Sequence, residues 1–359
     1  MDRPEISIHF DPIHPGSAVQ DIEVCPGKPA LEELFPRGEG RFFVTDSNVA
    51  QRSCAAPFLR GAKNLFVLPP GEEHKTLGNV GAIVKAALDC GMNRRGVFTA
   101  AGGGVVTDMT GFAASIFMRG ALWEALPTTL LAMVDAAIGG KTGCDIEGHK
   151  NTAGAFFPAR RVRCFPALTS TLTEGEYRSG LAEAFKTALL FDEDLFCLFR
   201  DKKNLILSRD PGVLTDMVRV CVCAKAAVVE EDFTEQGRRA FLNLGHTFGH
   251  ALESVAGLGT VTHGDAVAWG IGRALEVSAM TGLCSPSYRD GAAAVLGAYG
   301  WETGPWHPAL GRSSVDDLIA AMRRDKKNRG AGIRLVLQRD FGATVVRETE
   351  EELIRRVLP

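Results

Sequence analysis

The segment "RGVFTAAGGGVVTDMTGFAASIF" at residues 95–117 places the tightest constraint on the fold. A short apolar run leads into three glycines and then into apolar residues at helical spacing, which predicts a strand, a tight turn and a helix. Strands are also predicted at 41–46 and at 64–68, where two prolines follow, and a helix is predicted at 77–92. Strands that alternate with helices indicate βαβ units, so we expect a parallel sheet in this half of the chain.

The second half of the chain is predicted to be mostly helical. From about residue 173 onward apolar residues recur at helical spacing, and the only clear strand-like segment is "IRLVLQ" at 333–338. A chain of 359 residues is long for a single core. We therefore expect two domains, an α/β domain over residues 1–173 and a mostly α-helical domain over 174–359.

Charge and cysteine usage exclude several classes of protein. The net charge of −3 gives no basic surface for nucleic acid or an anionic membrane, and no apolar run approaches the length of a membrane span. The nine cysteines are scattered and odd in number, which argues against a disulfide framework and a cysteine zinc site. The first residues contain no apolar signal segment. We expect a cytoplasmic protein that binds neither nucleic acid nor membranes.

The glycine-rich turn at 102–104 is a candidate phosphate site. Backbone N–H groups at a helix N-terminus, free of side chains, suit a phosphate or pyrophosphate, and Asp108 could bind a ribose hydroxyl or cap the helix. The spacing differs from G-x-G-x-x-G, and a tight turn without a ligand is the alternative.

The segment "LPTTLLAMVDAAIGGKTGCDIEGHKNTAG" at 126–154 is a candidate anion site. Asp135, Lys141, Lys150 and Asn151 stand among its glycines, and lysine acts as a point charge for phosphate. The alternative is that both lysines are solvated loop residues. A cluster of charged residues at 325–329 includes Lys326 and Lys327. We interpret it as a solvated loop, unless the ligand of the protein is anionic.

The third candidate combines histidines with a carboxylate. His246 and His250 are four residues apart on a predicted helix, and His263 and Glu183 are available as further ligands. Two histidines and a glutamate with an open position are typical of a catalytic zinc site, whereas two core histidines bonded to backbone are the alternative. Glu183 and Lys186 share a helix face, either as a surface ion pair or as a buried functional pair.

Taken together, these motifs resemble the 3-dehydroquinate synthase family of the sugar phosphate cyclases. "GGGVVTDMTGF", "LPTTLLAMVDAAIGGKTG", "SGLAEAFK", "LNLGHTFGHALE" and "HGDAVAWG" occur in that family's order. The resemblance implies a Rossmann-like N-terminal domain that binds NAD, a helical C-terminal domain that binds zinc or cobalt, and a homodimer. It implies conversion of 3-deoxy-arabino-heptulosonate 7-phosphate to 3-dehydroquinate and phosphate in the shikimate pathway. In that reaction bound NAD transiently oxidises a hydroxyl, phosphate is eliminated, the hydride returns and an aldol step closes the ring.

The resemblance also assigns roles to individual residues. The implied metal ligands are Glu183, His246 and His263. The implied catalytic residues are Lys141, Asn151, Lys186, His250 and, acting on the neighbouring subunit, Arg119. The implied substrate-binding residues are Asp135, Lys225, Arg239, Asn243 and one of Lys326 and Lys327. The implied NAD-binding residues are Asp46, Asn48, Glu72, Lys75, Gly103, Gly104, Val105, Asp108, Thr128, Thr129, Lys150 and Thr171.

Some positions depart from the family pattern. Thr107 replaces a usual glycine, Phe165 lies near a frequent aspartate, and Asp265 replaces a glutamate, which would loosen the support of His263. The alternatives are therefore another sugar phosphate cyclase, which forms an amino-dehydroquinate or a cyclitol, and a metal-dependent alcohol or glycerol dehydrogenase. A binding protein without activity would have lost a metal ligand, and all the candidates are present.

Overall fold

The computed structural model describes residues 5–10, 18–30, 40–52, 62–257, 259–324 and 332–359. The chain forms two compact units, the first from residues 1–172 and 211–234 and the second from 173–210 and 235–359. A division at residue 173 puts α9 (Pro211–Glu231) in the second unit, whereas its contacts with the strands β1 (Ile6–His9) and β2 (Val19–Val24) put it in the first. Every helix in the described part of the chain is too short or too polar to cross a membrane.

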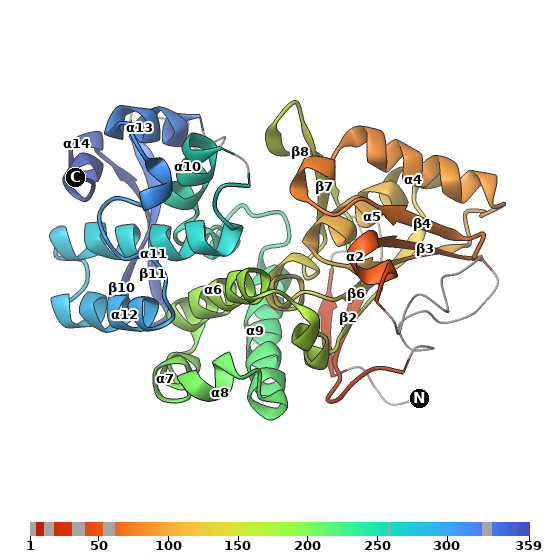
Figure 1. Ribbon diagram of the computed structural model, residues 1–359, viewed down its shortest axis with the longest axis horizontal. Helices are drawn as coiled ribbons and strands as arrows, with labels where there is room; N and C mark the ends of the chain where they lie inside the picture. Colours follow the sequence, from red (N-terminus) through yellow and green to blue (C-terminus); the bar gives the residue numbers. More distant parts are fainter. Residues whose placement is uncertain (1–4, 11–17, 31–39, 53–61, 258, 325–331) are drawn as a thin grey trace. The chain divides into compact units, whose positions relative to one another are not determined.

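A seven-stranded sheet forms the centre of the first unit (Figure 1). Its order is β1 (Ile6–His9), β2 (Val19–Val24), β9 (Arg161–Cys164), β6 (Leu122–Pro127), β5 (Val97–Gly102), β3 (Arg41–Asp46) and β4 (Leu65–Leu68). All pairs are parallel except β1 with β2. The predicted parallel sheet is confirmed, as are its strands at 41–46 and 64–68.

The strand β3 is buried on both faces, which explains its continuous apolar sequence. Successive side chains of a strand point to opposite faces. Phe42 packs edge-on against Phe98, with ring centroids 5.7 Å apart, and Phe43 joins a separate cluster that contains Leu126 and Phe165. The helices that follow the strands are α2 (Ser47–Ala50), α4 (Leu77–Asp89) and α5 (Gly104–Ile116).

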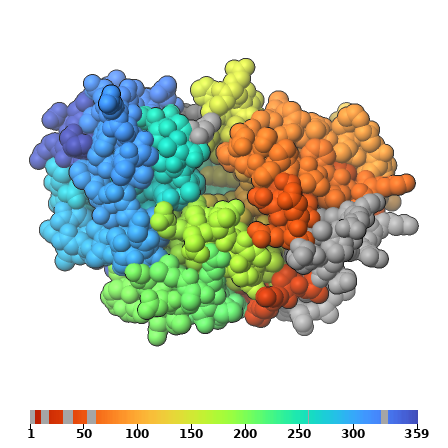
Figure 2. Space-filling view, viewed as in Figure 1, coloured from red at the N-terminus to blue at the C-terminus, as the bar shows by residue number. Residues whose placement is uncertain are grey.

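The glycine-punctuated segment after β6 forms a π-helix and a hairpin. The π-helix η3 spans Ala132–Ala136, and the hairpin consists of β7 (Lys141–Ile146) and β8 (His149–Phe156). The tip of the hairpin, yellow in Figure 2, stands out from the surface of its unit. Short 3₁₀ helices complete this part of the chain: η1 (Glu72–His74), η2 (Phe117–Arg119) and η4 (Pro166–Thr171).

The second unit is mostly helical, as predicted. Its elements are α6 (Glu174–Phe191), α7 (Glu193–Asp201), α8 (Lys203–Leu207), η5 (Arg238–Asn243), α10 (His246–Ala256), α11 (His263–Met280), α12 (Pro286–Ala298), η6 (Pro308–Leu310), α13 (Val315–Arg323), β10 (Ile333–Asp340), β11 (Ala343–Thr349) and α14 (Glu351–Arg356). The expectation of one strand was wrong, because β11 pairs antiparallel with β10. Its residues are mostly half-buried or exposed, so it lacks the apolar alternation that predicts a strand.

Glycines bring the helices of the second unit into backbone contact. A Cβ on Gly270 of α11 would lie 2.0 Å from the carbonyl oxygen of Gly245, just before α10. A Cβ on Gly264 would lie 2.2 Å from Cα of Ser179 in α6. These contacts leave no room for a methyl group. The first contact holds the start of α10 against α11, and the second holds the start of α11 against α6.

We expect Gly270→Ala to lower the free energy of unfolding by about 1–3 kcal/mol or more, because the backbone of Gly245 has to move to admit the methyl group. Gly291→Ala is the matched control, since a Cβ at that exposed position of α12 meets nothing within 4 Å. The control should raise stability by roughly 0.4–1 kcal/mol. Urea unfolding measures both changes, and equal effects of the two substitutions would contradict the packing argument.

Candidate functional site

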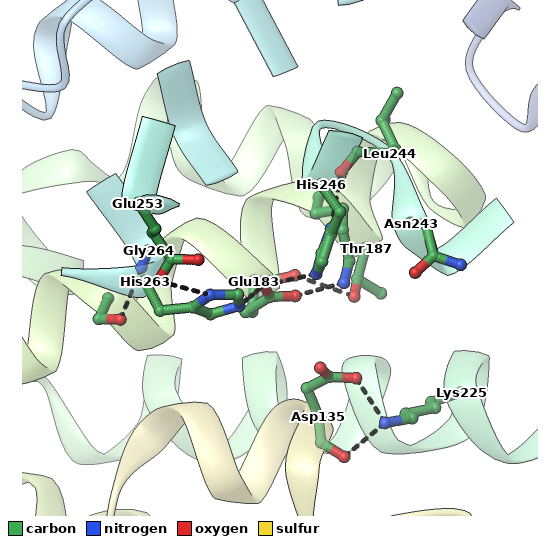
Figure 3. A network of polar contacts seen from close by, with 12 residues as sticks. Asp135, Glu183, Thr187, Lys225, Asn243, Leu244, His246, Glu253, His263 and Gly264 are labelled. Carbon is green, nitrogen blue, oxygen red and sulfur yellow. Dashed lines mark hydrogen bonds and ion pairs between the residues drawn. The ribbon is translucent and has the colours of Figure 1, made fainter. Parts of the chain in front are cut away.

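Three side chains of the second unit converge on one point. Oε1 of Glu183 lies 3.3 Å from Nε2 of His263 and 3.7 Å from Nε2 of His246. One ligand atom from each of the three residues lies within 4.8 Å of the others (Figure 3). Carboxylate oxygen and imidazole nitrogen are the donors that zinc and cobalt accept in sites with an open coordination position. The three side chains therefore fit a divalent metal ion.

Local structure explains why these residues meet. Glu183 is in the middle of α6 and only 1% exposed. His246 is the first residue of α10 and follows Gly245, whose φ of 80° is in the left-handed region that favours glycine. His263 is the first residue of α11, whose N-terminus is capped by Thr262. Both histidines thus lie at helix starts where glycines bring neighbouring backbones into contact.

The charges around Glu183 are compensated within the site. Lys186 is 2% exposed and forms an ion pair with Glu183, so this pair is buried, which decides against the surface alternative. Burial lowers the pKa of His246 well below its usual value, and the nearby Lys186, His250 and His263 lower it further. Burial also disfavours the charged form of His263, but the carboxylates of Glu183 and Glu253, which accept from its ring N–H groups, outweigh burial and raise its pKa to about 10.

The second nitrogen of each metal-facing histidine also meets an acceptor. Nδ1 of His246 lies 3.2 Å from the carbonyl oxygen of Leu244, and Nδ1 of His263 lies 3.6 Å from Oε1 of Glu253. Sequence reasoning missed Glu253, although it follows His246 by seven residues and His250 by three. At this spacing the three side chains share one face of a helix.

The residues assigned to NAD lie at the carboxyl ends of neighbouring parallel strands of the first unit. Asp46 ends β3 and Asn48 follows it, Glu72 and Lys75 follow β4, Gly103, Gly104 and Val105 follow β5, and Thr128 and Thr129 follow β6. The strands β3 and β5 are neighbours in the sheet. The strand that follows β3 along the chain, β4, lies on one side of this pair, and the strand that follows β5, β6, lies on the other. Open α/β sheets bind ligands outside the strand ends at such a change of direction. The tertiary structure thus brings together residues that are dispersed in the sequence.

The N-terminus of α5 is open toward a ligand. Gly103 precedes the helix and no side chain caps it, so the alternative in which Asp108 caps the helix is wrong. A Cβ on Gly103 would lie 3.0 Å from Cγ2 of Thr129, so a larger residue at this position would crowd the Thr129 side chain. Uncapped backbone N–H groups at the start of a helix suit a phosphate group. The uncapped start of α5 at Gly103 and Gly104, called the phosphate cradle below, fits the pyrophosphate of a dinucleotide.

Lys75 joins residues that were assigned to different ligands. Its buried ammonium lies 2.8 Å from Oδ2 of Asp108, 2.7 Å from Oδ1 of Asn151 and 3.7 Å from Oε1 of Glu72. Burial lowers the pKa of Lys75, but the carboxylates of Asp108 and Glu72 outweigh burial and raise it overall. Burial raises the pKa of Asp108 against the opposing effect of Lys75. The structure therefore places Asn151, assigned to the substrate, beside residues assigned to NAD.

Other assigned residues have partners within their own unit. Lys225 of α9 donates to the carbonyl oxygen and to Oδ1 of Asp135 in η3, both at 2.5 Å. Nδ2 of Asn243 donates to Oε1 of Glu235 at 2.7 Å, and Arg239 is fully buried in η5.

The remaining assigned residues lie on less buried segments. Lys141 is the exposed first residue of β7, and Lys150 lies in β8. Thr171 ends η4, and Arg119 is exposed in η2 with a φ of 67°. Lys326 and Lys327 lie outside the described residues.

The departures from the family pattern have structural explanations. The hydroxyl of Thr107 donates to the carbonyl oxygen of Gly104 at 3.0 Å, and Phe165 is buried in the core cluster around Phe43. Asp265 pairs with Arg178 at 2.8 Å, whereas the carboxylate beside Nδ1 of His263 belongs to Glu253. The expectation that Asp265 supports His263 is therefore corrected.

Comparison with known proteins identifies the family. A curated 3-dehydroquinate synthase from Acidithiobacillus ferrooxidans is 41% identical over 310 residues, which are 84% of this chain and 83% of the relative. The model of the 3-dehydroquinate synthase N-terminal part matches residues 65–179, and that of the C-terminal part matches 180–328. The chain belongs to the 3-dehydroquinate synthase family.

Further similarities agree with membership of the 3-dehydroquinate synthase family. The curated 3-dehydroquinate synthase of Salinibacter ruber is 38% identical over 354 residues, 96% of this chain and 91% of the relative. Among solved structures, 2-epi-5-epi-valiolone synthase from Streptomyces hygroscopicus, with NAD⁺ and Zn²⁺ bound, has a TM-score of 0.83 and 28% identity over 94% of this chain and 95% of that chain.

We expect metal binding to release about one proton, because without a metal the pKa of His263 is about 10 and the ring carries both protons at neutral pH. A metal on Nε2 has to displace one of them, so the affinity for Co²⁺ should increase as the pH rises toward that value. Calorimetry in buffers of different ionisation enthalpy measures the proton count. An affinity that is independent of pH between about 6 and 8 would contradict the protonated state of His263.

Proposed function

We propose that this protein is a 3-dehydroquinate synthase, which converts 3-deoxy-arabino-heptulosonate 7-phosphate to 3-dehydroquinate and inorganic phosphate. The observation that carries the proposal is the convergence of Glu183, His246 and His263 in a chain that matches the family over both of its parts. A catalytic metal centre and an open phosphate cradle at the strand ends are the two sites that this reaction requires.

The proposed cofactors are NAD and a divalent metal ion, zinc or cobalt. Glu183, His246 and His263 would hold the metal, and the uncapped start of α5 with Gly103 and Gly104 would hold the pyrophosphate of NAD. When bound, the metal supplies a Lewis acid for the substrate hydroxyls, and NAD supplies a hydride acceptor that is restored in each cycle.

The cationic residues of the site have the charge that an anionic substrate needs. We assign the phosphate to Lys141, Asn151, Lys186 and His250, and the carboxylate and nearby hydroxyls to Lys225 and Arg239. Asp135 and Asn243 are assigned to the substrate without a particular group. Asp135 holds the Lys225 ammonium through two oxygens, which orients it in advance. Lys186 is held by Oε2 of Glu183, so its charge lies beside the metal ligands. Such preorganised charges bind a substrate without reorganisation.

Two other activities remain as alternatives. A cyclase that forms a cyclitol or an amino-dehydroquinate has support in the valiolone synthase similarity, but that identity is 28%, against 41% for a 3-dehydroquinate synthase. Thr107 and Phe165 have packing roles, so they do not indicate another product. An alcohol or glycerol dehydrogenase has no use for buried cations such as Lys186 and Lys225 around one small alcohol.

We also propose a homodimer in the cytoplasm, in which Arg119 acts on the partner's substrate phosphate. Ile116, Met118 and Leu122 surround Arg119 in sequence and are 48%, 42% and 40% exposed. Exposed large apolar side chains close together in the sequence support burial of this segment against another chain. The backbone of Met118 and Arg119 has positive φ in both residues, a strained conformation typical of functional positions.

The activity is tested with the metal-loaded protein, NAD and the heptulosonate phosphate. We expect inorganic phosphate and 3-dehydroquinate in equal amounts and no net NADH, because the hydride returns to the product. Phosphate, NADH absorbance and product mass are followed together. NADH that accumulates with product would identify a dehydrogenase, and phosphate release with another product mass would identify another cyclase.

The dimer is tested by mixing two inactive variants, Arg119→Ala and Lys186→Ala. If Arg119 acts across the interface, a mixed dimer has one complete site, and random exchange should restore about a quarter of the wild-type activity. Light scattering gives the mass of each variant. If the mixture stays inactive while both variants are dimers that exchange subunits, Arg119 acts within its own chain, and an Arg119→Ala variant that is active by itself would show that Arg119 has no catalytic role.

A further inference from the structure

The ring of His263 lies between two carboxylates (Figure 3). Nε2 faces Oε1 of Glu183 at 3.3 Å, and Nδ1 faces Oε1 of Glu253 at 3.6 Å. An imidazole that binds a metal through Nε2 carries its proton on Nδ1, and this proton needs an acceptor. An ionised carboxylate accepts hydrogen bonds and donates none, so Glu253 selects the tautomer in which Nε2 is free for the metal.

The other metal-facing histidine follows the same pattern. Nδ1 of His246 lies 3.2 Å from the carbonyl oxygen of Leu244, so its Nε2 is also the nitrogen that faces Glu183. Both rings are therefore oriented by an acceptor on the far side. Leu244 provides a neutral acceptor for one ring, and Glu253 provides a charged one for the other.

Glu253 is built into the site by packing. Its residue is 7% exposed, and burial of a carboxylate is costly unless it is paired. It lies on α10, the helix that also begins with His246, whereas His263 begins α11. A Cβ on Gly249 of α10 would lie 2.9 Å from the carbonyl oxygen of Ala266, so the backbones of the two helices are in contact between these residues. One helix thus supplies a ligand and the carboxylate that orients the next ligand.

A second arrangement of the same residues is geometrically possible. One ligand atom from each of His250, Glu253 and His263 also lies within 4.8 Å of the others. This second set shares His263 with the set of Glu183, His246 and His263. A metal ion in the second set would bind His263 through Nδ1, which is the nitrogen that faces Glu253. The two sets assign opposite roles to Glu253, so an experiment can separate them.

We propose that Glu253 is a positioning residue, which accepts the Nδ1 proton of His263 and so directs Nε2 toward a metal ion held with Glu183 and His246. This inference rests on the metal site of the proposed function. Carboxylates that orient a metal-binding histidine increase metal affinity, and their loss reduces it by about 10–100-fold.

The test compares the affinity of the full-length protein for Zn²⁺ and Co²⁺ by competition with a chelator. We expect Glu253→Ala to lower metal affinity by about 10–100-fold and Glu253→Gln, whose amide oxygen still accepts the proton, to lower it less. Glu276→Gln is the matched control, because Glu276 lies on α11 with His263 but pairs with Arg289 at 3.1 Å. The control should keep the wild-type affinity. Circular dichroism establishes that each variant is folded. If Glu253→Ala is unstable, the metal affinity of Glu253→Gln is compared with that of the wild type instead.

A spectroscopic readout separates positioning from a general loss of stability. In ¹⁵N-histidine-labelled, zinc-loaded protein, long-range ¹H–¹⁵N correlations should show His263 protonated on Nδ1, and Glu253→Ala should shift or broaden this signal while His246 keeps its tautomer. Wild-type affinity and an unchanged His263 signal in Glu253→Ala would overturn the proposal.

Glu183→Ala distinguishes a failure of this inference from a failure of the metal site. If Glu183→Ala abolishes metal binding and Glu253→Ala does not weaken it, the metal site stands and the positioning role is wrong. If Glu183→Ala retains the metal and Glu253→Ala loses it, the ion is held by His250, Glu253 and His263, and both assignments are wrong.

Discussion

A buried carboxylate, Glu183, is the constraint on which the second unit depends. It is almost inaccessible to solvent in the middle of α6, and a carboxylate in such a position has to be compensated by cations, hydrogen bonds or a metal. Lys186 pairs with one of its oxygens, and two imidazoles face the other. These partners come from three helices, so the helices have to meet at this point.

Glycine is the means by which the helices approach so closely. Gly264 and Gly270 lie where a methyl group would overlap the backbone of a neighbouring segment. Their lack of a side chain brings the start of α10 against α11 and the start of α11 against α6, and the first residues of α10 and α11 are the two histidines. The same glycines therefore determine both the packing of the unit and the geometry of its candidate metal site.

In the first unit, the order of the strands determines which polar residues lie close together. Its parallel strands end side by side, so the loops that follow them collect polar residues from distant parts of the chain. Lys75 then links Asp108 of α5 with Asn151 of the hairpin β7–β8. A buried lysine between a carboxylate and an amide holds these segments in register, and a ligand at the strand ends would meet an arrangement that is already ordered.

The sequence by itself determined the parallel α/β unit, the helical unit and the candidate ligands Glu183, His246 and His263, because these depend on local periodicity and on motifs of a recognisable family. Strand β11 and the placement of α9 were decided only by the tertiary structure, since both depend on partners far away in the sequence. The roles of Asp265 and Glu253 were likewise beyond sequence reasoning. The family pattern pointed to Asp265, which replaces a glutamate there, but the side chain that faces Nδ1 of His263 comes from a neighbouring helix. Which carboxylate supports a ligand is a property of helix packing, and that packing exists only in the folded chain.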